Sequence, residues 1–135
     1  MHIITRVAFI AALLFAGTSC NINGPSESIA GHWIAQGVGH SSWFGLTLQQ
    51  NGDEVMGTAC HGDPRTIFRD APVAGDYPSV RVDVTAQSLE PCCPQLAGAR
   101  FVGRLDSTRD IVGTYQTPSM RVDLRFRRSD ASACP

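Results

Sequence analysis

Apolar and polar residues alternate with a period of two in this sequence from Gly31 onward. In the segment 79–85 every second residue is valine, and Arg81 and Asp83 lie between them. The same pattern in 120–126 predicts four inward side chains, Met120, Val122, Leu124 and Phe126. Because successive side chains of a strand point to opposite faces, this alternation predicts antiparallel strands with one buried face. No segment has a helical period over a useful length, so we predict an all-β fold.

Turn residues divide the alternating region into short strands. Asn51-Gly52 is the strongest hairpin signal, because a type I′ turn needs two residues that tolerate positive φ. The predicted strands cover 30–35, 43–50, 54–59, 66–69, 72–77, 79–85, 100–105, 110–116 and 120–126. The short segments 66–69 and 72–77 leave the total at eight or nine. We predict a single antiparallel up-and-down β-barrel of about eight strands, with a β-sandwich as the alternative, because period two does not reveal closure.

Three glycines share the parity of the predicted interior, namely Gly57, Gly103 and Gly113. Glycines inside strands suit the bends that a closed sheet requires. They also raise the question of whether the interior is open, because they either leave a pocket or let large neighbours interdigitate. If a pocket exists, its predicted ligand-binding residues are the aromatic side chains of the interior, Trp33, Phe44, Phe101, Tyr115 and Phe126.

The N-terminal segment 1–20 has the organisation of an export signal. Arg6 precedes an apolar run over 7–16. This run is too short to span a bilayer, which takes about 20 apolar residues. Small residues then lead to Cys20. This arrangement resembles the lipobox of bacterial lipoproteins, although that family prefers leucine where Gly17 stands. The resemblance implies cleavage after Ser19, acylation of Cys20 and a lipid anchor in the membrane.

The resemblance also suggests a location. Asn21 follows the cysteine where an aspartate would imply retention at the inner membrane, so we expect attachment to the outer membrane of a bacterial envelope, facing the periplasm. An ordinary signal for a secreted or soluble periplasmic protein is the alternative. Residues 20–28 then form a flexible tether, and 29–135 form the β-barrel domain.

Cysteine parity agrees with export. Apart from Cys20, the chain has Cys60, Cys92, Cys93 and Cys134, an even number that suits disulfides in an oxidising compartment. Joining the adjacent Cys92 and Cys93 would close a strained ring. We therefore predict that Cys60 pairs with one of these two and Cys134 with the other, which leaves two connectivities open.

Charge and motifs exclude several kinds of function. The chain has 11 basic residues, all arginine, and 12 acidic residues, giving a net charge of −1. This balance does not suit a nucleic-acid partner. Cys60, His61 and Asp63 are of metal-ligating types, but no C-x-x-C chelate accompanies them. No serine lies in a G-x-S-x-G motif. We predict no metal, no cofactor and no catalytic residues, and hence no enzyme.

Gly31-His32-Trp33 at the first strand resembles the G-x-W motif of lipocalins and avidin-like barrels. In those families an arginine of the last strand lies over this tryptophan, and Arg125, Arg127 and Arg128 lie on the last predicted strand. The resemblance implies a calycin-like barrel closed at one end by a cation–π pair. It implies no specific ligand.

Two functions follow as hypotheses. The first is an exported, lipid-anchored protein that holds a small apolar or amphipathic ligand in its barrel. The alternative is an envelope protein–protein interaction module, similar to lipid-anchored protease inhibitors, with 87–96 as a rigid protrusion. A stripe formed by Arg121, Arg125, Arg127 and Arg128 is either the solvated face of a strand or a surface for anionic headgroups or an acidic partner.

Overall fold

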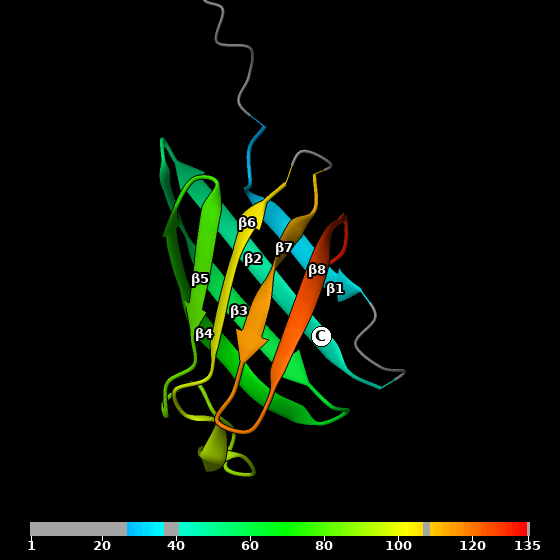
Figure 1. Cartoon of the computed structure of the whole chain (residues 1–135). Helices are drawn as coiled ribbons and strands as arrows, with labels where there is room; N and C mark the ends of the chain where they lie inside the picture. The colour runs from blue at the N-terminus through cyan, green and yellow to red at the C-terminus, as the bar shows by residue number, and fades with distance from the viewer. Residues whose placement is uncertain (1–26, 37–40, 107–108, 135) are drawn as a thin grey trace, which may run out of the picture.

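The structure, a computed structural model, describes residues 27–36, 41–106 and 109–134. Eight strands form one closed barrel in which each strand pairs with its neighbours in the chain, and β1 pairs with β8. All pairs are antiparallel, as Figure 1 shows. The strands are β1 Gly31–Gln36, β2 Trp43–Asn51, β3 Glu54–Gly62, β4 Thr66–Asp76, β5 Ser79–Asp83, β6 Arg100–Leu105, β7 Ile111–Gln116 and β8 Arg121–Ser129. The predicted barrel is confirmed, and a sandwich is excluded.

The alternation in the sequence is the alternation between interior and exterior. Val80, Val82 and Val84 are buried, whereas Arg81 is exposed. Met120 breaks the predicted pattern, because it is 54% exposed in the turn before β8. Its carbonyl accepts a hydrogen bond from the Thr117 amide, which closes that turn. The inward row of β8 therefore begins at Val122.

Two details of the β2–β4 region differ from the sequence-based prediction. The β2–β3 ladder continues to the pair Asn51↔Glu54, so Gly52 and Asp53 form the two-residue loop. Of these two, only Gly52 has a positive φ, so the turn is not type I′. The predicted strands 66–69 and 72–77 are one strand, β4. A bulge near Asp70 inserts one extra residue into β4, and the ladder with β3 continues on both sides of the bulge.

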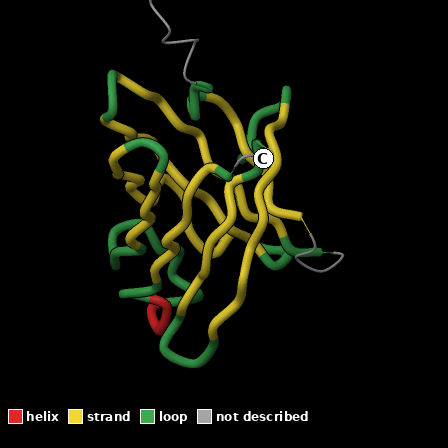
Figure 2. Tube along the Cα trace, turned by 45° about the horizontal axis from the view of Figure 1, so that its top comes forward, coloured by secondary structure: helices red, strands yellow, loops and turns green. Residues whose placement is uncertain are grey.

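The two ends of the barrel are distinct. At one end, which we call the Trp33 end, β1 begins and β8 finishes. At the other, which we call the His61 end, β3 finishes and the long connection 84–99 joins β5 to β6. This connection contains a 3-10 turn, η1 Pro94–Leu96, drawn red in Figure 2, which is the only helix in the described part of the chain.

The disulfide connectivity predicted from the sequence is wrong. Cys60 pairs with Cys134, and the adjacent Cys92 and Cys93 pair with each other. After β8 the chain turns back across the outer face of β2, where a Cβ on Gly45 would overlap the Ala133 backbone. This path brings Cys134 to the outward side chain of Cys60 on β3. Cys92 and Cys93 lie in an irregular turn, where no strand geometry opposes an eight-membered ring.

Candidate functional site

The five predicted ligand-binding residues lie together inside the barrel, where they pack against each other. Phe44 is central, with ring centroids 5.2 Å from Tyr115, 5.3 Å from Phe126 and 6.3 Å from Phe101. Phe101 and Phe126 are themselves 5.1 Å apart. Trp33 is fully buried in the same core. Phe68, which the ligand prediction omitted, also packs edge-on against Phe44 at 5.6 Å.

Interior glycines accommodate these rings. A Cβ on Gly103 would lie 2.5 Å from Cζ of Phe101, and one on Gly113 would lie 2.8 Å from the same atom. Of the two roles considered for these glycines, the structure shows the second at Gly103 and Gly113, where they make room for a large neighbour. None of the five best-defined pockets that the described residues form is lined by the aromatic core.

Two polar side chains enter this aromatic cluster at the His61 end. The His61 ring stacks on Phe44 with centroids 5.2 Å apart, and its centroid lies 6.0 Å from that of Tyr115. Tyr115 is only 6% exposed, and its hydroxyl has no hydrogen-bond partner among the described residues. Burial raises the pKa of Tyr115 to about 12. The hydroxyl is therefore a protonated donor without an acceptor, which is costly in a core.

The His61 imidazole is held in one tautomer. Its Nδ1 lies 2.7 Å from the Trp43 carbonyl oxygen. Because a carbonyl oxygen can only accept, Nδ1 carries the proton and Nε2 of the neutral ring is an acceptor. Burial lowers the pKa of His61 below its ordinary value and outweighs the opposing effects of that hydrogen bond and of Asp63. The predicted strand 54–59 ended before His61, which left this residue in a loop, although His61 continues the inward parity of Val55, Gly57 and Ala59.

The residues of metal-ligating type at 60–63 do not converge. The sulfur of Cys60 is bonded to Cys134 on the outer face, whereas His61 points into the barrel. Within the described ranges, no three histidine, cysteine, aspartate or glutamate side chains lie close enough together to hold a metal ion.

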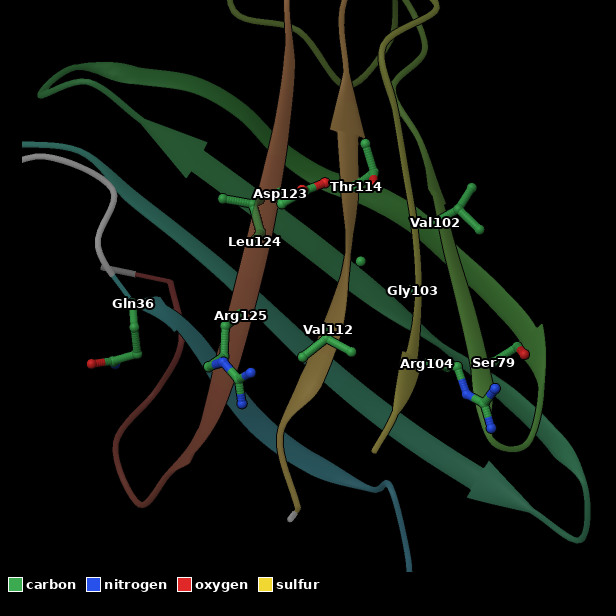
Figure 3. Close-up of a pocket in the computed structure, with 11 residues that line it drawn as sticks. Gln36, Ser79, Val102, Gly103, Arg104, Val112, Thr114, Asp123, Leu124 and Arg125 are labelled. Carbon is green, nitrogen blue, oxygen red and sulfur yellow. Dashed lines mark hydrogen bonds between the residues drawn. The ribbon is translucent and has the colours of Figure 1, made fainter. Parts of the chain in front are cut away.

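A pocket with a volume of about 740 Å³ lies on the outside of the barrel, across β5 to β8 (Figure 3). Strand register arranges its residues in rows. Val112 of β7 has Arg104 of β6 on one side and Arg125 of β8 on the other. The next outward row is Val102, Thr114 and Asp123. Val102 is 51% exposed, so this pocket has an apolar floor between arginine side chains.

A second, smaller pocket of about 280 Å³ continues this one along β7 and shares Val102 and Thr114 with it. Its outer row is Arg100, Gln116 and Arg121. We call the two pockets together the β7 groove. Its two arginine pairs, Arg100 with Arg121 and Arg104 with Arg125, lie about 13 Å apart along the strands, since four residues separate them.

The arginines of the β7 groove differ in their partners. Arg100 binds Asp83 at 3.1 Å, and Arg125 binds Asp110 at 2.5 Å. Desolvation raises the pKa of the Asp83 carboxyl, but hydrogen bonds and attraction from Arg81 and Arg100 outweigh it and leave the pKa below its ordinary value. Arg104 and Arg121 form no ion pair with any described residue. Two cations of the groove thus have no ion-pair partner in the part of the chain that the structure describes.

The predicted arginine stripe divides between two roles. Arg121 and Arg125 belong to the β7 groove, and Arg127 lies 3.9 Å from Asp110. The guanidinium of Arg128 instead lies 4.4 Å from the Trp33 ring centroid, the contact that the G-x-W resemblance implied. Arg128 also donates hydrogen bonds to the carbonyls of Ser28 and Ala30, which fasten the segment before β1.

The predicted export signal, Cys20 and most of the predicted tether lie outside the described residues. Glu27 and Ser28, the last two tether residues, contact the barrel through Arg109 and Arg128. In the part of the chain that the structure describes, no helix combines the length and the apolarity needed to cross a membrane. Compared with models of protein families, with curated proteins and with solved structures, the chain matches none.

Proposed function

We propose that this protein is a binding module of the bacterial cell envelope that holds an acidic segment of a partner protein in its β7 groove. The observation that carries this proposal is that Arg104 and Arg121, two arginines without an ion pair to any described residue, lie in an outward groove with an apolar floor. Aromatic side chains occupy the barrel interior, and the larger groove pocket has a volume in the usual range of binding sites. The role is binding rather than catalysis.

The groove favours a peptide over a membrane surface. Asp123 lies between the two arginine pairs, where it accepts a hydrogen bond from Thr114 at 2.9 Å. A bilayer would bring anionic headgroups against this carboxylate, at an electrostatic cost. An extended segment can instead place two acidic side chains four residues apart, which matches the spacing of the arginine pairs, with an uncharged residue over Asp123. Val102 and Val112 would contact its aliphatic groups.

Peptide binding tests this proposal. The probe is a fluorescent, otherwise uncharged peptide with two glutamates four residues apart, and its control has them two residues apart. We expect the first to bind more tightly. Arg104→Glu with Arg121→Glu should weaken its binding about tenfold or more, since two exposed ion pairs become repulsive. Arg65→Glu, outside the groove, should change binding less than twofold. Equal affinity in the double variant, or tighter binding to phosphatidylglycerol vesicles than to peptide, would contradict the proposal.

A second candidate function rests on the Tyr115 hydroxyl. A small apolar ligand with a carbonyl group, entering at the His61 end, would accept a hydrogen bond from Tyr115. A hydroxyl on the same ligand would donate to Nε2 of His61. Such a ligand would have to displace part of the aromatic cluster, with Phe44 and Phe68 around it. This is the lipocalin-like role in which the interior supplies affinity by burial.

Thermal shift distinguishes this candidate from the first. Lipophilic ketones and hydroxyketones should raise the melting temperature of the wild type, and Tyr115→Phe should lose most of the increase. Variants of Arg104 and Arg121 should keep it. Unchanged melting temperatures across the series would count against an interior ligand and leave the β7 groove proposal unaffected.

We also propose export and a lipid anchor on Cys20 at the outer membrane. The pairing of four cysteines as disulfides supports an oxidising compartment. Mass spectrometry of the membrane fraction should find a chain that begins at an acylated Cys20, and Cys20→Ala should move the protein to the soluble fraction. A soluble wild type with an unmodified N-terminus would refute the anchor.

A further inference from the structure

The two disulfides differ in what they contribute to the fold. Cys60–Cys134 joins residues 74 positions apart, and Cys60 is only 1% exposed beneath the C-terminal tail. Such a bond stabilises the fold by restricting a long loop of the unfolded chain. Cys92–Cys93 joins neighbours, so it closes no chain loop beyond its own ring. Cys92 is also exposed to solvent. The second bond therefore needs an explanation other than global stability.

The connection that carries Cys92–Cys93 is fixed to the barrel by other contacts. Backbone hydrogen bonds join Arg69 to Ser88 at 3.1 Å and Glu90 to Ile67 at 2.9 Å, so 88–90 runs beside β4. At the base of the connection, the Val84 amide donates to the Ala99 carbonyl at 2.9 Å. None of these bonds involves a cysteine. Opening the eight-membered ring would leave this framework in place.

We propose that Cys92–Cys93 is a thiol–disulfide exchange site whose co-reactant is a protein dithiol. A thiolate of that dithiol attacks the sulfur of Cys92, the more exposed residue of the pair, the S–S bond breaks, and Cys93 leaves as a thiolate that takes up a proton. The second thiolate of the partner then attacks its own mixed-disulfide sulfur, and Cys92 leaves in the same way. The partner becomes a disulfide, and the pair gains two electrons and two protons.

This inference does not depend on the β7 groove. None of the residues that line the groove belongs to the connection 84–99, which carries the exchange site. Reduction of Cys92–Cys93 should leave peptide binding by the groove unchanged. Failure of one proposal therefore leaves the other standing.

Selective reduction is the first test. The folded protein is treated with increasing dithiothreitol, alkylated and mapped by mass spectrometry. We expect two alkyl groups per chain, on Cys92 and Cys93, at a reduction rate about tenfold or more above that of Cys60–Cys134, because the latter is shielded. The near-ultraviolet circular dichroism should stay native. Simultaneous reduction of both bonds, or four free thiols before treatment, would overturn the proposal.

Trapping is the second test. An oxidoreductase with a Cys-x-x-Ser site can attack but cannot resolve the mixed disulfide. We expect it to form a covalent adduct mapped to Cys92 in the wild type and none in Cys92→Ala with Cys93→Ala, a matched control that keeps Cys60–Cys134. No adduct in the folded wild type would show that this bond does not exchange, and an adduct of equal yield in the control would assign the reaction to another cysteine and overturn the proposal.

Discussion

The two ends of the barrel cover the core with different sets of contacts. At the Trp33 end the polar groups around the core have partners. The indole Nε1 donates to the Ile29 carbonyl at 2.9 Å, and the Ile29 amide donates to the Gln50 side chain at 2.9 Å. Arg128 covers the indole and binds two carbonyls. Among the described residues, no buried side-chain polar atom at this end lacks a hydrogen-bond partner, and such satisfied contacts stabilise a core.

At the His61 end the core is aromatic, but not all of its described polar groups have hydrogen-bond partners. The Tyr115 hydroxyl has no partner within the described residues, and His61 is buried as a neutral ring. The exposed Cys92–Cys93 bond lies in the connection at this same end. The contacts of the Trp33 end therefore stabilise the fold. The His61 end instead retains an unpaired buried hydroxyl, which lowers the free energy of unfolding, and a disulfide in an exposed connection. Groups retained at a cost are candidates for function.

The largest effect is expected from removing the central side chain of the Trp33 end. Trp33 is a fully buried indole. Trp33→Ala should lower the free energy of unfolding by about 3–5 kcal/mol, because it removes this side chain and leaves a cavity. Trp43→Ala is the matched control, since Trp43 is half-buried on the outer face and should lose less than half as much. Chemical denaturation measures both. Equal losses would contradict the assignment of Trp33 as the main stabilising residue of this end.

Arg128→Ala should lower the free energy of unfolding by about 1–2 kcal/mol, since it removes an exposed cation–π contact and two charged hydrogen bonds to carbonyls. Arg128→Lys should recover only part of this, because an ammonium lacks the planar fork. The neighbouring Arg127→Ala, which loses only a long exposed ion pair, should stay within about 0.5 kcal/mol of the wild type. If Arg127→Ala lowered the free energy of unfolding as much as Arg128→Ala, the loss could not be assigned to the contact between Arg128 and Trp33.

At the other end, Tyr115→Phe should raise the free energy of unfolding by about 1 kcal/mol, because it removes a buried donor without an acceptor. Tyr77→Phe, in the β4–β5 turn at the Trp33 end, should have little effect. The alkaline absorbance titration should lose its component near pH 12 in Tyr115→Phe only. A destabilised Tyr115→Phe would show that the hydroxyl has a favourable partner, and the contrast between the ends would fail.

The smallest effect is a pH dependence. Burial lowers the pKa of His61 in the folded state, so the unfolded chain binds the proton more readily. Stability should be fully present above the ordinary histidine pKa, about 6.5, and decline as the pH falls below it. His61→Gln should flatten this decline, whereas His32→Gln, on the outer face, should not. Melting temperatures between pH 7 and pH 5 measure it, and identical slopes in all three proteins would refute it.

Much of the fold could be predicted from local pattern. The alternation of Val80, Val82 and Val84 indicated the buried face of β5. The G-x-W resemblance anticipated the position of an arginine over Trp33, though three arginines were candidates. The prediction for Met120 failed because a turn at Thr117 overrides the alternation. His61 was misplaced because its strand was expected to end at Ala59, whereas β3 continues to Gly62.

The candidate sites were less predictable, because each depends on residues far apart in the chain. Val112 lies between Arg104 and Arg125 only through the register of three strands. The orphan hydroxyl of Tyr115 could be recognised only once the rings around it had been placed. The disulfide prediction failed for the same reason, since the path of the C-terminal tail decides which sulfur Cys134 can reach.

The sequence by itself determined most of the strands and their inward and outward faces, because these follow from backbone geometry with a period of two; the exceptions were the division of β4, the end of β3 and the side chain of Met120. The tertiary structure alone decided the closure between β1 and β8, the contact of Phe101 with Gly103 and Gly113, and the pairing of the cysteines. These outcomes depend on strand register and on the space left between packed side chains, which no local pattern encodes.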